Sequence, residues 1–279
     1  MLDHQEGRLR FLRRGTAPRQ RRFRRGVYLL PSLFTLGNMF CGYACVVYAM
    51  RGEYETAAPF IGFAIVLDML DGRIARLTGT ASAFGVEFDS LADVISFGIA
   101  PAILSFAWGL SPLGRLGWAA GFMFLTAGAM RLARFNIQSA AGGDKRYFVG
   151  MPSPAAAAVP AATVFAYPAG LYDYREALPA LAMVLVPAVL MVSTIRFRSF
   201  ETIDLQTRRP YTFLLLIAGG IMLITTHPRF VLVLLAYSYL ASAFVGMAIT
   251  RFRRRGGRGV SDEGTPQAEQ TRPRDSAAR

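Results

Sequence analysis

The chain has 279 residues, of which 53% are hydrophobic and 18% are charged, and its formal net charge is +13. Soluble domains carry about 25% charged residues, so this composition argues against a soluble globule, and it also excludes disordered, collagen-like and disulfide-rich proteins. A positive charge of this size can indicate nucleic acid binding, but here the basic residues lie between long apolar runs. We therefore predict a membrane protein without a nucleic acid partner.

Eight apolar segments follow one another along the chain, each close to the ~20 residues that cross a bilayer as a helix. Their predicted limits are 27–50, 57–77, 83–108, 115–138, 152–171, 177–195, 210–226 and 230–250. The sequence thus predicts an all-α, polytopic membrane protein with about eight transmembrane helices. Its predicted parts are a basic N-terminal arm at 1–26, a transmembrane domain at 27–250 and a basic, disordered tail at 251–279.

The distribution of basic residues predicts the orientation in the membrane. If the N-terminus is cytoplasmic and the segments alternate, 27 of the 31 Lys and Arg residues lie on the cytoplasmic side and 4 on the outer side. This asymmetry follows the positive-inside rule, so we expect both termini in the cytoplasm. Four aromatic residues are then expected near the outer interface, where amphipathic rings are enriched. They are Trp108, Trp118, Tyr172 and Tyr174.

Four aspartates in the second and third apolar segments are the main functional signal. Asp68 and Asp71 are three residues apart, and Asp89 and Asp93 are four apart, so each pair shares one face of its helix. A carboxylate inside a spanning helix costs several kcal/mol and usually has a function. A tight turn through Gly79 would make the two helices antiparallel neighbours and bring the four carboxylates together near the cytoplasmic ends.

Four clustered carboxylates would repel one another unless cations lie between them. Two divalent cations would cancel the four charges, and ligation by oxygen alone favours Mg²⁺ or Mn²⁺ over zinc. Two metal ions held close together suit phosphoryl transfer. Gly72, Ala75 and Gly85 leave room for a ligand beside the acidic faces, and Arg76 can pair with a phosphate. A proton or cation relay, as in an ion-coupled transporter, is an alternative that this pattern leaves open.

The two acidic segments resemble the signature of the CDP-alcohol phosphotransferases. The matching residues are Asp68-x-x-Asp71-Gly72-x-x-Ala75-Arg76 and, eight residues later, Gly85-x-x-x-Asp89-x-x-x-Asp93. All eight fixed positions and both internal spacings of that signature are present. The motif covers 68–93, and the hydropathy pattern extends the resemblance from about 27 to 250.

The resemblance implies an enzyme in which an alcohol hydroxyl attacks the phosphorus of a CDP-linked lipid and CMP leaves. It implies that Asp68, Asp71, Asp89 and Asp93 hold two Mg²⁺ or Mn²⁺ ions, with Asp68 and Asp89 bridging them and Asp93 also acting as general base. It further implies a homodimer. The residues expected to contact the CDP-lipid are Thr35, Asn38, Gly72, Ala75, Arg76, Ser82 and Gly85.

Four further stretches resemble the bacterial phosphatidylserine synthase branch of this family: 31–38, 131–136, 150–155 and 193–200. The branch implies transfer from CDP-diacylglycerol to L-serine in the cytoplasmic membrane, with the site facing the cytoplasm. Arg131 and Arg134 are candidates for binding the serine carboxylate and Asn136 for hydrogen bonding to serine. Membrane anchoring by the arginines and helix capping by Asn136 are the alternatives. Other acceptors, namely glycerol-3-phosphate, inositol phosphate or choline, also stay open.

Overall fold

The computed structural model describes residues 29–79, 82–140, 147–193, 196–198, 218–220, 222–223 and 225–256. This part of the chain is helical apart from one antiparallel pair of three-residue strands, β1 (Tyr147–Val149) and β2 (Arg196–Arg198). The predicted all-α class is therefore confirmed, although the short ribbon was not predicted. The arm at 1–26 and the tail beyond 256 lie outside the described residues.

The helices follow the predicted apolar segments closely. They are α2 (Leu29–Met50), α3 (Tyr54–Thr78), α4 (Ala83–Asp93), η1 (Val94–Ile99), α5 (Ala100–Ser105), η2 (Phe106–Leu110), η3 (Ser111–Leu113), α6 (Arg115–Ala140), α7 (Ser153–Ala166), α8 (Tyr174–Val192) and α10 (Pro228–Gly256). Most of the predicted segment 210–226 lies outside the described residues. The helix expected to end at 250 continues to Gly256, so the first residues of the predicted tail are helical.

Four of these stretches are long and apolar enough to cross a membrane: Ser32–Met50, Ala83–Leu113, Arg115–Ser139 and Tyr174–Val192. Shorter apolar helices cover Ser153–Ala166 and Pro228–Phe244. The structure thus supports a polytopic membrane protein with four candidate spans among the described residues. The total of eight spans and the cytoplasmic placement of both termini remain predictions.

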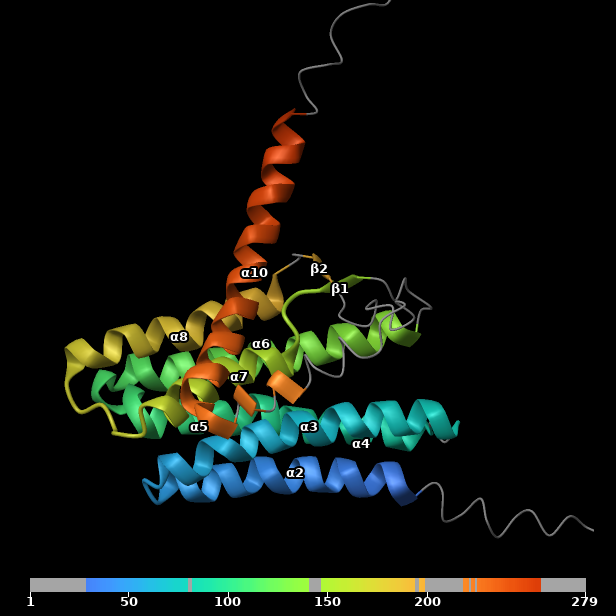
Figure 1. Cartoon of the computed structure of the whole chain (residues 1–279), viewed down its shortest axis with the longest axis horizontal. Coiled ribbons are helices and arrows are strands. Elements are labelled where there is room, and N and C mark those ends of the chain that lie inside the picture. The colour runs from blue at the N-terminus through green and yellow to red at the C-terminus, as the bar shows by residue number, and fades with distance from the viewer. Residues whose placement is uncertain are drawn as a thin grey trace, which may run out of the picture.

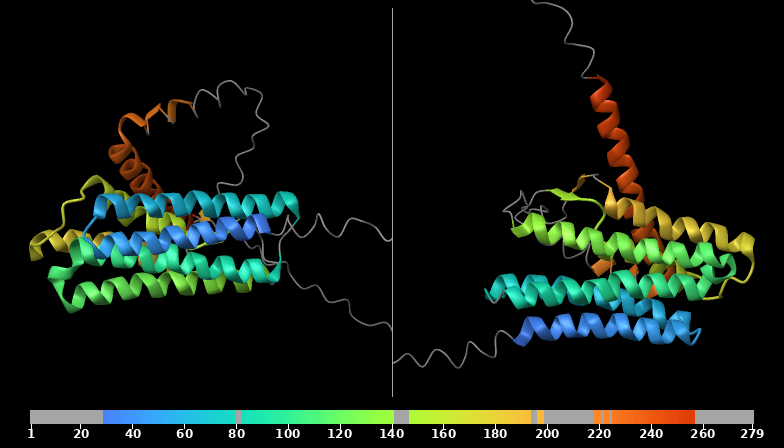
Figure 2. Two further views of the ribbon diagram at one scale, coloured as in Figure 1. Left: turned by 90° about the horizontal axis from the view of Figure 1, so that it is seen from below. Right: turned by 180° about the vertical axis from the view of Figure 1, so that it is seen from behind.

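Most of the helices lie side by side in one bundle (Figures 1 and 2). Helix α2 packs against α3 and also against α4, η1 and α5, while α6 packs against α8. Helix α2 begins, α3 ends, α4 begins and α6 ends at the same end of the bundle (Figure 1). We call this the site end, because the acidic residues lie nearest to it.

Helices α3 and α4 run antiparallel, as predicted (Figure 1). Gly79 ends α3 with a φ of 62°, a conformation that glycine adopts without steric cost. However, the two helices do not pack closely along their lengths, and α2 packs against both of them instead. The two helices are nevertheless neighbours, as predicted, because α3 contacts η1 and α5, which continue α4 in the same helical run.

Helix α10 runs across the bundle rather than along it (Figures 1 and 2). Its first half packs against α7, where the Tyr237 hydroxyl and Thr163 Oγ1 are 3.0 Å apart. Arg229 at its start forms an ion pair with Glu55 of α3. These contacts hold the first half of α10 against α7 and the start of α3.

One residue predicted near the outer interface is buried in the core of the bundle. Trp108 is only 4% exposed, and its indole Nε1 donates a hydrogen bond to the Tyr167 carbonyl at 2.8 Å. The indole thus packs inside the bundle, and its position near the outer interface stays a prediction. Trp118 and Tyr172 are exposed, as an interfacial position requires, and so is Tyr174.

Candidate active site

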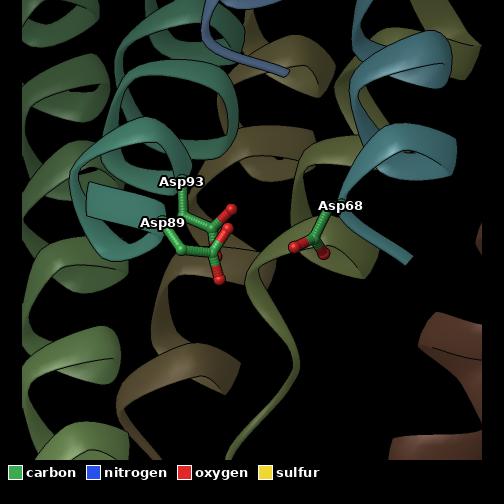
Figure 3. Close-up of side chains that lie close together, drawn as sticks. All are labelled: Asp68, Asp89 and Asp93. Carbon is green, nitrogen blue, oxygen red and sulfur yellow. The ribbon is translucent and has the colours of Figure 1, made fainter. Parts of the chain in front are cut away.

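Three carboxylates meet between α3 and α4. One oxygen each from Asp68, Asp89 and Asp93 lies within 4.8 Å of the other two. Asp89 and Asp93 stand one turn apart on the same face of α4, and Asp68 points toward them from α3 (Figure 3). Asp93 is 9% exposed, and Asp89 Oδ1 is buried with no hydrogen-bond partner in the described part of the chain. We call these three residues the acidic trio.

The acidic trio fits a divalent cation. A buried carboxylate oxygen without a partner carries a full desolvation penalty, which a cation at that position would offset. The donor set consists of carboxylate oxygens alone. Mg²⁺ and Mn²⁺ prefer oxygen ligands, whereas softer metals prefer sulfur or nitrogen. The structure thus brings together three of the four predicted metal ligands.

The fourth predicted ligand, Asp71, lies outside the acidic trio. Its side chain is 5% exposed, and its Oδ2 accepts a hydrogen bond from Thr35 Oγ1 of α2. The charge of Asp71 is nevertheless close enough to act on Asp68 and Asp89. A role of Asp71 in metal binding therefore remains a prediction, and its hydrogen bond to Thr35 is a finding that the sequence did not predict.

Two residues expected to contact the CDP-lipid form hydrogen bonds to carboxylates of α3 and α4. Thr35 donates to Asp71, and Asn38 Nδ2 donates to Asp93 Oδ1 at 3.2 Å. Thr35 is 2% exposed and Asn38 is 0% exposed, so both side chains face the interior of the protein. Because they lie three residues apart on α2, one face of that helix binds one carboxylate of α3 and one of α4.

The other candidates for CDP-lipid contact lie where α3 ends and α4 begins. Gly72 is exposed, and no atom outside its own helix lies within 4 Å of the position a Cβ would take, so the space beside it is open. Arg76 is also exposed, and Ala75 is partly buried. Ser82 caps α4, since its Oγ accepts a hydrogen bond from the Gly85 N–H at 3.0 Å. The capping role of Ser82 was not predicted.

Of the three candidates for serine binding, Arg131 is the one whose charge acts on the acidic trio. It is 9% exposed, donates from Nη1 to Ser153 Oγ at 3.0 Å, and its Nε has no hydrogen-bond partner among the described residues. Its positive charge acts on Asp68 and Asp93. A buried position of this kind does not suit an arginine that anchors a helix at the membrane surface.

Arg134 and Asn136 have partners on other elements. Arg134 Nη1 donates to the Val192 carbonyl at the end of α8, at 3.2 Å. Asn136 Nδ2 donates to Ser90 Oγ of α4, at 2.9 Å. Both contacts join α6 to a neighbouring helix, so the structure gives these two side chains a packing role that spacing alone did not reveal.

The chain matches the model of one protein family. The family model described as CDP-alcohol phosphatidyltransferase matches residues 28–195, a range that contains the acidic trio, Thr35, Asn38 and Arg131.

The relatives are enzymes with serine in their names. The chain is similar to the CDP-diacylglycerol–serine O-phosphatidyltransferase of Helicobacter pylori (strain 26695), with 41% identity over 180 residues, 63% of this chain and 75% of that protein. It is 41% identical over 142 residues to the Mycobacterium leprae protein of the same name, 49% of this chain and 47% of that protein. It is 34% identical over 180 residues to the archaetidylserine synthase of Methanothermobacter thermautotrophicus, 64% of this chain and 73% of that protein.

The acidic trio predicts measurable Mn²⁺ binding by the purified protein. We expect Asp89→Asn to weaken Mn²⁺ binding about tenfold or more, since it removes one charge from the trio. Free Mn²⁺ can be followed by electron paramagnetic resonance during titration of the protein in detergent. Glu87→Gln is the matched control, because Glu87 is exposed on the same helix and lies outside the trio. Equal Mn²⁺ affinity in the two variants would contradict the site.

Proposed function

The chain belongs to the CDP-alcohol phosphatidyltransferase family, and we propose that it transfers the phosphatidyl group of CDP-diacylglycerol to the hydroxyl group of L-serine. The products are phosphatidylserine and CMP. The observation that carries this proposal is the convergence of Asp68, Asp89 and Asp93 between α3 and α4, at the spacing of the family signature. The printed names of the relatives support serine as the acceptor.

The chemistry of Arg131 also favours serine among the possible acceptors. Serine carries a carboxylate, and a guanidinium with an unpaired Nε–H can bind a carboxylate through charge-assisted hydrogen bonds. Choline has no anionic group for such a contact. Glycerol-3-phosphate and inositol phosphate carry a phosphate, which a guanidinium binds as well, so the choice of serine over these two rests on the names of the relatives.

We propose that Asp93 is the general base. Its carboxylate accepts the proton of the serine hydroxyl while the serine oxygen forms a bond to phosphorus and the bond from phosphorus to CMP breaks. Asp68, Asp71, Asp89 and Asp93 would hold two Mg²⁺ or Mn²⁺ ions, which when bound neutralise charge and polarise the phosphoryl oxygens. The CDP group would bind at the site end, beside Gly72, Ala75, Arg76, Ser82 and Gly85.

We further propose a position in the cytoplasmic membrane, with the site and both termini facing the cytoplasm. Arg73 and Arg76 lie at the site end, and the count of 27 against 4 basic residues favours the same side. The lipid tails would then enter the site from the bilayer, while serine and the metal ions arrive from the cytoplasm. A homodimer is proposed on the family likeness alone.

The activity itself is the first test. We expect the purified protein, given CDP-diacylglycerol, Mn²⁺ or Mg²⁺ and labelled serine, to release CMP and form phosphatidylserine in equal amounts, and we expect a chelator to abolish both. Asp93→Asn should lower turnover about 10²-fold or more because the base is lost, while CDP-lipid still binds. Glu87→Gln should turn over like the parent.

Parallel reactions with glycerol-3-phosphate, inositol phosphate and choline identify the acceptor. CMP release with one of these but not with serine would overturn the serine assignment. Cation-dependent flux in proteoliposomes without CMP release would instead indicate a transporter. Near-normal turnover of Asp93→Asn would contradict the assignment of the base.

The serine pocket has a separate test. Arg131→Lys keeps the charge but loses the planar set of donors, so we expect the KM for serine to rise about tenfold or more. The KM for CDP-diacylglycerol should change less than about twofold, because the lipid does not use this contact. Arg115→Lys, at the opposite end of the bundle, is the matched control. A lower kcat with an unchanged KM for serine would show that Arg131 acts on the carboxylates instead.

A further inference from the structure

The Asn38 side chain lies in the interior of the protein, against the carboxylate of Asp93. Its exposed fraction is 0%, and its Nδ2 donates to Asp93 Oδ1 at 3.2 Å. The bond joins residues 55 positions apart in the sequence, on α2 and α4. The Nδ2 group of Asn38 is therefore committed to Asp93, while its Oδ1 is buried with no hydrogen-bond partner among the described residues.

The backbone of Asn38 is fixed as well as its side chain. The hydroxyl of Ser96, which is 0% exposed, donates to the Asn38 carbonyl at 2.8 Å. Ser96 lies three residues after Asp93, so the two residues present the same face of one helical run to α2. Asn38 is therefore held at both ends by the run that carries Asp93.

A close approach of two backbones makes this arrangement possible. A Cβ at Gly42, one turn after Asn38, would lie 2.6 Å from Ser96 Oγ and 2.8 Å from Ser96 Cα. Only glycine fits at such distances, so α2 and η1 touch here without an intervening side chain.

The helix beside this contact is irregular. Asp93 is the last residue of α4, and η1 is a π-helix over Val94–Ile99 in which the N–H of Ala100 reaches the Ile95 carbonyl. Single π-helical turns inside α-helices are rare and occur frequently at functional sites. The irregular turn begins directly after Asp93, at the point where Ser96 contacts α2.

We propose that Asn38 is a positioning residue for Asp93, held in place by Ser96 and by the contact at Gly42. The amide fixes the rotation of the Asp93 carboxylate, so that the carboxylate faces Asp68 and Asp89 rather than turning within the protein. This inference rests on the proposed function for the role of Asp93 as base. It extends that function to a residue that the sequence resemblance assigns to the CDP-lipid.

The test compares Asn38→Leu, which keeps the approximate size of the side chain but has no donor, with Ser105→Ala. Ser105 is a matched control because its buried hydroxyl bonds to the Pro101 carbonyl within its own helical run, away from the acidic trio. We expect Asn38→Leu to lower kcat and to weaken Mn²⁺ binding, each about tenfold, with the KM for CDP-diacylglycerol within about twofold. Ser96→Ala should cause a smaller change of the same kind.

The thermal midpoint in detergent separates positioning from packing. Asn38→Leu with normal kcat and Mn²⁺ affinity but a lower midpoint than Ser105→Ala overturns the proposal, since that result shows a structural role alone. If Asn38→Leu does not fold, Asn38→Asp decides, because it has the same shape but no amide donor. Turnover and Mn²⁺ affinity of Asn38→Asp within about twofold of the parent would overturn the proposal.

The Mn²⁺ measurement also keeps this inference separate from the proposed function. If the parent releases no CMP with any acceptor, the proposed function fails. The Mn²⁺ affinities of the Asn38 variants then decide the positioning role alone: weakened binding supports it, and unchanged binding overturns it.

Discussion

Repulsion between carboxylates in an apolar bundle is the constraint on which this structure depends. Asp68, Asp89 and Asp93 approach within 4.8 Å of one another, with Asp71 close by. In water such charges would be screened, but in a bundle of apolar helices each charge loses much of its hydration. Arg131 supplies a single positive charge, which cannot balance three or four negative charges. Divalent cations bound to the acidic trio would supply the remainder, and the same cations would suit the phosphate groups of a CDP-linked substrate.

The arrangement of α2 follows from this constraint. If α3 and α4 packed directly against each other, no space would remain between their acidic faces for cations and a diphosphate. Instead, α2 packs against both helices and binds one carboxylate from each, through Thr35 and Asn38. Helix α2 thereby fixes the side chains of Asp71 and Asp93.

The sequence predicts the helices and the acidic site well, because both depend on local spacing. Long apolar runs fix the limits of α2, α6 and α8 to within a few residues, and the intervals between the aspartates place them on two faces. The family signature adds the chemistry. Only the short turn at Gly79 was needed to infer that the two acidic helices lie beside each other.

The hydrogen bonds between helices could not be predicted in the same way. Periodicity shows that Thr35 and Asn38 share a face, but their partners are 36 and 55 residues away. The burial of Trp108 within η2 depends on the helices packed around it, which hydropathy does not show. The sequence indicates either serine binding or helix capping for Asn136, whereas its side chain donates to Ser90 on another helix. These features depend on how the helices pack, which a single sequence does not encode locally.

The most direct measurement is crystallographic. Crystals of the protein grown with Mn²⁺ and CDP-diacylglycerol, measured at the manganese absorption edge, locate the metal through its anomalous scattering. The account predicts two anomalous peaks between α3 and α4, each in contact with oxygens of Asp68, Asp89 or Asp93 and with the diphosphate beside them. Carboxylates that point away from one another, with the manganese peaks elsewhere or absent at a concentration that supports turnover, would contradict it.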